Sequence, residues 1–542
     1  MGSLRKLTVK GLELLHFKMP VFNTAVKLAQ DRALTRLRKI VDNSNPTVMD
    51  NPNQKKIVFN LVRGMYAAPI YVEAGLAMAL KHHGHNVKLL TCDGALSACP
   101  GYFEISKPPN KWSCNNCKQF SREFFDIVDL PYLTYAKYVD GYELSITKDR
   151  VNMTSIEDCK NFVYKDINVG VHAITSTQRF FKGVNPDKNT HDKVMRSELI
   201  NAIISTIVAE RVVKEEKPDV LVTSHSCYSS WGSFSDYFKN KDIRVCTYGG
   251  GYEKNTVIFE HDKLDENFKR YYKDVRNKKF LYEKEREELK SFLNKRMMGE
   301  KGDTSLYGFS ADKIKDIGKL FKITKYDKIH AMFTNVPWDT SLLNANNAFK
   351  DVYEWISYTI KLFEEKPELQ LIIKIHPAEK IAESASTVLD YLDSNFAHLP
   401  ENINVIPPDT KISPYSLFPI IDVGIVYNGT IGLEMVLNDI PVVVAGRSHY
   451  GEKGFTHDVT TKRGYADILF SDFFSPTNKN CAEVYAYFYF VKSFIPRNFT
   501  YYNNFLDLGW KINSLAEFAD GKDKYIDYIC DYIINGGIYQ NW

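Results

Sequence analysis

Short apolar runs that alternate with amphipathic helical stretches constrain this chain more than any other feature. KKIVFNLVRG (55–64) and NVKLLTC (86–92) are typical of buried strands, and residues 70–85 between them have the pattern of an amphipathic helix. A second series includes the apolar runs KIHAMFTNV (328–336) and LQLIIKIHP (369–377). Alternation of this kind favours parallel βαβ units. We therefore predict an α/β protein with two doubly wound, Rossmann-like domains that face each other across a cleft.

Changes in composition place the domain boundaries. Residues 262–303 are densely charged and helix-forming and lead to a linker near Gly302, and the sequence from about residue 482 is rich in Tyr and Phe. The predicted parts are a basic extension (1–50), a first domain with a cysteine-rich loop (51–310), a second domain (311–482) and a helical tail (483–542). A chain of 542 residues is long enough for this division.

Composition favours a cytoplasmic protein. The chain is 44% hydrophobic and 25% charged, as in ordinary globular proteins. It has no apolar run long enough to span a membrane, and its start does not resemble a secretory signal. Nine cysteines are an odd number for a disulfide scaffold and favour a reducing compartment.

The amino-terminal extension concentrates the positive charge of the chain. Residues 1–40 carry nine Lys and Arg against Glu13 and Asp31, with leucines and phenylalanines between them. Such a segment either lies on the anionic inner face of the cell membrane or packs as a helix on the first domain. We do not expect nucleic-acid binding, because the rest of the chain is mildly acidic.

Polar residues follow three apolar runs of the second series. Lys374 and His376 in LIIKIHPAEK lie on the same side of their strand, where they supply donors to an anion. The alternative is a lysine at a sheet edge and a histidine satisfied by the backbone. The loop AGRSHYGEKGFTHD (445–458) carries His449 and Tyr450 and predicts a clamp for sugar or phosphate.

IDVGIVYNGTIGLEMVLNDIP (421–441) places a tight turn, Asn428 and Gly429, between a strand and a helix. The amino terminus of that helix is expected to attract a phosphate, and Thr430 both to cap it and to donate a hydroxyl. Glu434 lies four residues after Thr430, so a capping box does not explain it. It is either a ligand of ribose hydroxyls or an exposed glutamate.

These motifs resemble the capsule and surface polysaccharide biosynthesis glycosyltransferases, a family that includes Kdo-transferase-like enzymes. The resemblance is carried by KIHPAE (374–379), YNGTIGLEMVLNDIPVVVAG (427–446) and HYGEKGFTHD (449–458), and FTNVPWD (333–339) is similar to the motif that opens the family's second domain. It covers about residues 330–460 well and the first domain only loosely. It implies a GT-B architecture in which the second domain holds most of the nucleotide sugar.

The resemblance also implies roles for individual residues. Lys374 and His376 would hold the donor's phosphates. Thr430 would replace the usual serine at the helix start, and Glu434 would contact the ribose. Enzymes of this architecture generally need no catalytic metal. Alanine at position 378 departs from the longer polar residue of related sequences and leaves the nucleotide open.

The first domain is then expected to hold the acceptor and the catalytic base. His225 in SHSCYSSWG follows the run PDVLVT, and an unperturbed imidazole titrates close to cytoplasmic pH. Asp93, which follows another strand, is the rival base. The glycines that begin with Gly249 and Gly250 predict a close approach of the backbone to substrate.

Four cysteines form a candidate metal site. Cys92, Cys99, Cys114 and Cys117 have the spacing C-x6-C-x14-C-x2-C, and the last pair is spaced as in a zinc knuckle. The alternatives are structural zinc, an iron–sulfur cluster and free thiols.

The main hypothesis is an inverting glycosyltransferase that acts on a surface polysaccharide, such as capsule or lipopolysaccharide, or on a lipid-linked precursor. The alternatives are transfer of a polyol phosphate from a CDP-linked donor, a nucleotide-sugar 2-epimerase with the same two-domain plan, and a non-catalytic scaffold.

Overall fold

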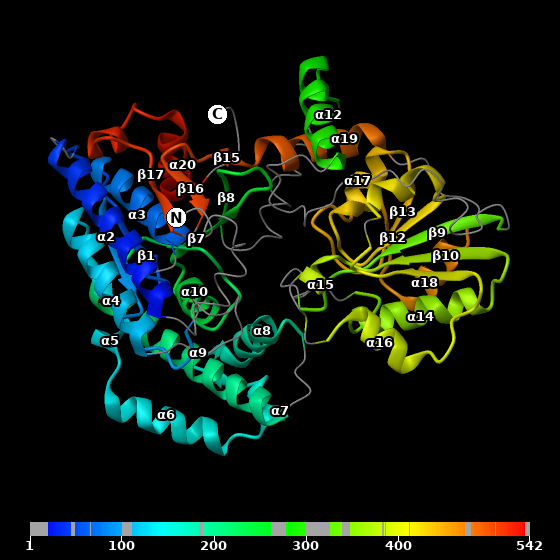
Figure 1. Cartoon of the computed structure of the whole chain (residues 1–542), viewed down its shortest axis with the longest axis horizontal. Coiled ribbons are helices and arrows are strands. Elements are labelled where there is room, and N and C mark those ends of the chain that lie inside the picture. Colours follow the sequence, from blue (N-terminus) through cyan, green and yellow to red (C-terminus); the bar gives the residue numbers. More distant parts are fainter. Residues whose placement is uncertain are drawn as a thin grey trace.

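The computed structural model describes most of the chain. The described residues are 20–44, 49–64, 67–99, 111–183, 188–261, 278, 280–298, 326–338, 347–381, 384, 386–410, 412–471, 478–504 and 506–536. Figure 1 shows two units side by side, each built on its own sheet, with helices α12 and α19 near the top between them. The linker predicted near Gly302 lies outside the described residues.

The first sheet has the strand order β15-β8-β7-β6-β1-β2-β3. Its parallel strands are β1 (Lys56–Asn60), β2 (Asn86–Thr91), β3 (Tyr132–Thr134), β6 (Val220–Thr223) and β7 (Arg244–Gly250), and its antiparallel strands are β8 (Thr256–His261) and β15 (Ile495–Pro496). The sequence predicted the strand at β1 because the three residues at its centre, Ile57, Val58 and Phe59, are apolar. Such runs are typical of parallel strands that helices cover on both faces.

The connections of the first unit are mainly helical. They are α3 (Ala67–His82), α4 (Lys111–Ile127), α5 (Tyr135–Tyr138), α6 (Gly141–Met153), α7 (Ile156–Cys159), the hairpin of β4 (Val163–Tyr164) and β5 (Ile167–Asn168), α8 (Val169–Phe181), α9 (Lys188–Glu216) and α10 (Gly232–Lys239). Helix α9 lies against α8 and α10, and its apolar residues join the strands in a buried core.

The second sheet has the order β11-β10-β9-β12-β13-β14 and is parallel throughout. Its strands are β9 (Lys328–Phe333), β10 (Leu369–Lys374), β11 (Ile403–Ile406), β12 (Val423–Val426), β13 (Val442–Val444) and β14 (His457–Asp458). Its helices are α14 (Val352–Glu364), α15 (Ala378–Ile381), α16 (Val388–Asn395), η5 (Pro414–Ile420), α17 (Ile431–Leu437) and α18 (Lys462–Leu469). The predicted pair of doubly wound, Rossmann-like units is confirmed, while the cleft between them stays a prediction.

Strand order decides which loops meet. In each sheet the first strand of the unit lies between its second strand and a strand from much later in the chain: β1 lies between β2 and β6, and β9 lies between β10 and β12. In the first sheet the chain runs from β1 to β2 on one side and from β6 to β7 on the other, and in the second sheet β9 leads to β10 and β12 leads to β13 in the same way. Two adjacent strands whose connections run in opposite directions create a topological switch point at their carboxyl ends. Ligands of open α/β sheets bind at such points.

Helix α2 (Pro20–Asp42) packs on the first unit. It buries Val26, Leu34, Leu37 and Ile40 and leaves most of its Lys and Arg residues exposed. For these residues the structure supports the second interpretation of the basic extension, a helix packed on the first domain. Residues 1–19 lie outside the described part. None of the described helices is both long enough and apolar enough to cross a membrane.

Helix α12 (Glu283–Met297) and the tail connect the two units. The tail comprises α19 (Lys479–Tyr487), the π-helix η6 (Phe488–Lys492), β15, the hairpin of β16 (Thr500–Asn504) and β17 (Asp507–Trp510), η7 (Leu515–Phe518) and α20 (Lys524–Asn535). Helix α12 contacts α19 and η6, whereas β15 pairs with β8 of the first sheet. The prediction of a purely helical tail is wrong, because aromatic residues suit strands as well as helices.

The tail is fastened to α3 by buried aromatic residues. Trp510 donates a hydrogen bond from Nε1 to the carbonyl oxygen of Tyr71 at 2.7 Å. A Cβ atom added to Gly75 on α3 would lie 2.6 Å from the ring of Phe499 and 3.2 Å from Nε1 of Trp510. The absence of a side chain at position 75 therefore lets the tail reach the helix.

We expect Gly75→Ala to destabilise the protein by about 1–3 kcal/mol, because the buried ring of Phe499 has to move. Urea denaturation followed by fluorescence measures the change. Gly141→Ala is the matched control, since a Cβ atom there meets nothing within 4 Å. Equal stability of both variants would show that the tail does not dock as described.

Candidate functional site

Hydrogen bonds connect three neighbouring strand ends of the second sheet. Asn335, after β9, donates from Nδ2 to Oδ1 of Asn428, after β12, at 2.7 Å. Thr334 accepts from the backbone N–H of His376, after β10, at 3.1 Å and donates its own N–H to the carbonyl oxygen of Lys374 at 3.1 Å. Five strand-end residues are thus held together at the switch point of this sheet.

The sequence analysis did not single out Asn335. Its side chain is 8% exposed, and Oδ1 is buried without a hydrogen-bond partner in the described part of the chain. A Cβ atom added to Gly429 would lie 4.0 Å from this oxygen, so Oδ1 faces the 428–430 turn. A buried acceptor without a partner costs about 1–3 kcal/mol. The motif FTNVPWD contained the signal, a polar residue directly after a buried strand.

Lys374 is buried at the end of β10, with 3% of its surface exposed. Its Nζ lies 3.4 Å from the carbonyl oxygen of Ile375, 3.4 Å from Oγ1 of Thr410 and 3.5 Å from the carbonyl oxygen of Pro407. Burial lowers the pKa of Lys374 to about 8. The carboxylate of Asp409 acts on Lys374 electrostatically and partly offsets this effect, but it makes none of these contacts, so an incoming phosphate would be a suitable direct partner.

His376 is half-buried, and its Nδ1 accepts from the backbone N–H of Ala378 at 3.1 Å. This bond fixes the orientation of the ring. The role of His376 toward a donor phosphate stays a prediction.

Thr430 does not cap its helix. It lies at the start of α17 in helical conformation, and its side chain makes no capping hydrogen bond. Oγ1 instead lies 3.3 Å from the hydroxyl of Tyr252, which comes from the first unit and follows β7. The expectation of a cap is wrong, and the structure places this hydroxyl where the two units meet.

Glu434 is not an exposed glutamate. Only 3% of the residue is exposed, and Oε1 accepts from Nε of Arg296 on α12 at 2.6 Å. The guanidinium of Arg296 also lies over the ring of Tyr252, 4.7 Å from its centroid. This buried ion pair joins α12 to α17. If Glu434 also contacts ribose, as predicted, it has to do so while Oε1 stays paired with Arg296.

Tyr450 lies inside the fold, whereas His449 is half-buried. Nδ1 of His449 is 2.9 Å from the hydroxyl of Tyr485, its ring stacks on Tyr489 at 4.2 Å, and burial lowers its pKa to about 3. Tyr450 is fully buried and donates to the carbonyl oxygen of Gly429 at 2.5 Å. For Tyr450 the prediction of a polar clamp is corrected, because this buried residue holds the 428–430 turn. His449 packs among tyrosines of the tail, and its predicted contact with sugar or phosphate stays untested.

The switch point of the first sheet holds His225. Its Nδ1 lies 3.3 Å from Nη2 of Arg63, after β1, and 2.9 Å from Oγ of Ser224. Burial, Arg63 and Arg179 lower the pKa of His225 well below its ordinary value, so the premise of an unperturbed imidazole is wrong. With Nδ1 accepting from Arg63, the proton of the neutral ring lies on Nε2.

Asp93 is less suited to act as the base. Both of its carboxylate oxygens accept from Nη2 of Arg122, at 2.8 and 2.7 Å. Both oxygens are therefore engaged by the guanidinium, and an acceptor hydroxyl would have to compete with it for either of them.

Gly249 and Gly250 end strand β7, which forms a hairpin with β8. A Cβ atom at Gly250 would meet nothing within 4 Å, and one at Gly249 would make an ordinary contact with Ile258. Packing requires glycine at Gly251, where a Cβ atom would collide with Oγ1 of Thr256. The predicted approach of substrate to Gly249 and Gly250 stays untested.

The four thiols predicted to bind metal lie on two segments of the first unit. Cys114 and Cys117 are both on helix α4, and Cys114 is near enough to Cys92 to act on it electrostatically. Among the described residues, a single group brings the metal-ligand atoms of three side chains close together, and this group contains no cysteine. The metal-site prediction for Cys92, Cys99, Cys114 and Cys117 therefore stays untested.

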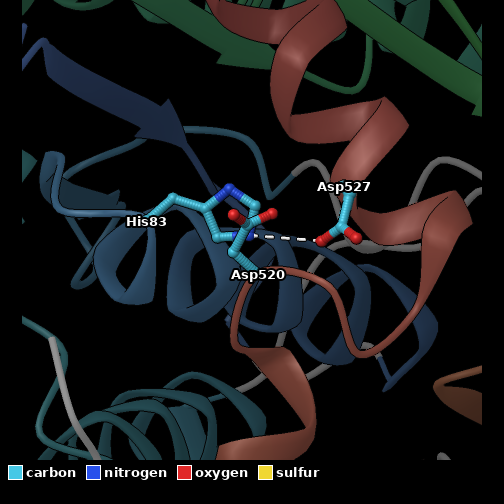
Figure 2. Close-up of side chains that lie close together, drawn as sticks. All are labelled: His83, Asp520 and Asp527. Atoms are coloured by element: carbon cyan, nitrogen blue, oxygen red, sulfur yellow. Dashed lines mark ion pairs between the residues drawn. The ribbon is translucent and has the colours of Figure 1, made fainter. Parts of the chain in front are cut away.

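That one group consists of His83, Asp520 and Asp527, shown in Figure 2. His83 follows α3, whereas Asp527 lies on α20 and Asp520 lies in the preceding turn. Nε2 of His83 is 3.4 Å from Oδ1 of Asp527. The contact adds a polar link between the tail and the first unit.

Residues 305–467 match the model of a protein family described as capsule polysaccharide biosynthesis protein. The match confirms the resemblance that the strand-end motifs indicated. The capsule-biosynthesis segment, residues 305–467, contains every strand of the second sheet and the residues at its switch point. No curated protein matches the chain.

Solved structures show weak similarity. A β-Kdo 2,7-transferase, KpsC, from Thermosulfurimonas dismutans is 13% identical over 52% of this chain and 78% of its own, with a TM-score of 0.31. The UDP-GlcNAc 2-epimerase from Neisseria meningitidis is 10% identical over 80% and 94%, with a TM-score of 0.22. The calicheamicin glycosyltransferase CalG4 is 14% identical over 80% and 94%, with a TM-score of 0.27. Similarities this low carry no argument about activity.

We expect Glu434→Gln to destabilise the protein by about 3–5 kcal/mol, because it leaves the buried charge of Arg296 unpaired. The double variant Glu434→Gln/Arg296→Met should recover most of that loss, as measured by urea denaturation. If Glu434 also contacts ribose, the double variant will still bind nucleotide weakly although its stability is restored. An equally large loss in both variants would contradict the described ion pair.

Proposed function

We propose that the protein is a glycosyltransferase that moves a sugar from a nucleotide-sugar donor to a surface polysaccharide or lipid-linked glycan. The observation that best supports this proposal is the group of Asn335, Asn428, Lys374 and His376 at the switch point of the second sheet. Open α/β sheets bind nucleotides at this place. The match of residues 305–467 to the model of a capsule polysaccharide biosynthesis family supports the choice of a sugar donor.

In the proposed mechanism the second unit binds the donor. Lys374 and His376 contact the diphosphate or monophosphate and stabilise the negative charge that develops on the leaving nucleotide. Oδ1 of Asn335 accepts a hydrogen bond from the donor, which satisfies its buried lone pairs. The hydroxyl of Thr430 lies beside Tyr252 of the first unit, so it would contact the donor on the side that faces the acceptor.

The first unit would bind the acceptor, and His225 would act as the base. Proton transfer requires Nδ1, because Nε2 carries the proton of the neutral ring while Arg63 donates to Nδ1. Release of Nδ1 by Arg63 therefore has to precede proton abstraction. A base in the unit opposite the donor favours inversion at the anomeric carbon. We assign no catalytic metal to the reaction, and we place it at the inner face of the membrane, to which the exposed basic residues of α2 would be attracted.

A thermal-shift screen against CMP, CDP, UDP, GDP and dTDP tests the proposed function. The matching nucleotide should raise the melting temperature, because a ligand that binds only the native state stabilises it. His376→Ala and Asn335→Ala should abolish that shift. Arg463→Gln, on an exposed side chain of α18, should keep it. No response to any of the five nucleotides would contradict a nucleotide-sugar donor.

Nucleotide affinity should also depend on the charge of Lys374. Its pKa is about 8, so the ammonium group carries its charge below that pH and loses it above. We expect the affinity to fall by up to about tenfold per pH unit above pH 8. Lys374→Arg should remove this dependence, because arginine keeps its charge. Calorimetric titration of the wild type and the variant across this range measures the slopes, and identical slopes would contradict a phosphate contact of Lys374.

A further inference from the structure

Three arginines converge on the switch point of the first sheet. Arg63 follows β1 and donates to His225. Arg179, near the end of α8, lies close enough to act electrostatically on the same imidazole. Arg497, directly after β15, and Arg63 both act on the hydroxyl of Tyr248 on β7. Arg63 is thus near both His225 and Tyr248, with Arg179 near the first of these residues and Arg497, in the tail, near the second.

None of these three arginines pairs with a carboxylate within the described part of the chain, and Nε of Arg63 and of Arg497 is buried there without a hydrogen-bond partner. Elsewhere, Arg122, Arg211 and Arg296 each pair with a carboxylate. Buried polar groups are normally hydrogen-bonded, so unpartnered guanidinium atoms in one place indicate a missing ligand.

Aromatic rings hold two of the guanidinium groups without neutralising them. Arg63 lies over Trp231, 4.7 Å from its centroid, and Arg179 lies over Trp338 of the second unit at 5.1 Å. Stacked in this way, a guanidinium keeps its edge and its charge available for a planar or tetrahedral anion. The Arg179 contact also places this group at the junction of the two units.

The buried carboxyl of Glu73 does not cancel this charge. It accepts from the hydroxyl of Tyr248 at 2.6 Å, and burial raises its pKa to about 8. At neutral pH it is mostly protonated. Its second oxygen, Oε2, is also buried without a partner and in the protonated form is one more donor for an anion.

We propose that Arg63, Arg179 and Arg497 form a binding site for an anionic group, a carboxylate or a phosphate, carried by the acceptor. That this anion belongs to the acceptor rests on the proposed function, whereas the anion site itself does not. Planar guanidinium groups with several donors suit both kinds of anion.

Occupation of this site would prepare the base. An anion that takes the donors of Arg63 removes the arginine from Nδ1 of His225 and leaves Oγ of Ser224, whose hydroxyl can rotate, as the remaining contact of that nitrogen. It also offsets the positive charge of Arg63 and Arg179, which together with burial lowers the pKa of His225. The ring would then be a stronger base only when an acceptor is bound, which limits wasteful hydrolysis of the donor.

Calorimetric titration with D-glucose 6-phosphate, D-glucuronate and D-glucose tests the site. We expect one or both anionic sugars to bind and the uncharged sugar to give no measurable heat. The tighter of the two identifies the preferred anion. Arg179→Gln and Arg497→Gln should weaken binding at least about tenfold. Arg463→Gln is the matched control and should bind as the wild type does.

Lys374→Ala separates this site from the second unit. If it abolishes binding while the Arg179 and Arg497 variants retain it, the anion occupies the nucleotide site and the proposal is overturned. No binding of either anionic sugar overturns it as well. If anion binding depends on the arginines but no nucleotide binds the wild type, the anion site stands and the glycosyltransferase proposal fails.

The titration of His225 gives an independent readout. Its ring signal in NMR, identified by its loss in His225→Asn, should titrate at higher pH in the presence of the bound anionic sugar. A merely structural role of the arginines would leave the midpoint unchanged. An unchanged midpoint at saturating ligand would overturn the coupling between the anion and the base.

Discussion

The order of strands in the two parallel sheets is the constraint on which the rest of this structure depends. In each unit the first strand lies inside the sheet. The next two strands add on one side of that first strand, and the later strands add on the other side. Residues that are far apart in sequence therefore meet at the carboxyl ends of the central strands. Asn335 meets Asn428 in the second unit, and Arg63 meets His225 in the first. The same topology thus builds two polar sites, one with amide and lysine groups and one with arginines.

Contacts between the units bring these two sites toward each other. Tyr252, after the glycines of β7, reaches Thr430 and lies under the guanidinium of Arg296, which pairs with Glu434. On another side Arg179 lies over Trp338. The chain also crosses between units twice, because α12 packs on α19 and the tail returns to the first sheet through β15. A donor in one unit and an acceptor in the other would therefore be held by a shared framework.

Both sites contain buried polar atoms without partners in the described part of the chain. They include Oδ1 of Asn335, Nε of Arg63 and of Arg497, and Oε2 of Glu73. Each such atom lowers stability, whereas an apolar replacement of similar shape would not. A fold that keeps them at two switch points is consistent with selection for binding rather than for stability.

The sequence by itself determined the elements and the plan of this protein. Apolar runs predicted the strands, the alternation with helices predicted two Rossmann-like units, and the strand-end motifs indicated the family that matches residues 305–467. These features depend on local periodicity, which neighbouring residues encode.

Only the tertiary structure decided which side chains meet. It put Asn335 between the predicted strand ends, paired Glu434 with an arginine 138 positions away in the chain and placed Tyr450 inside the fold. The physical reason is that strand order and side-chain burial depend on packing between distant segments, which no local pattern specifies.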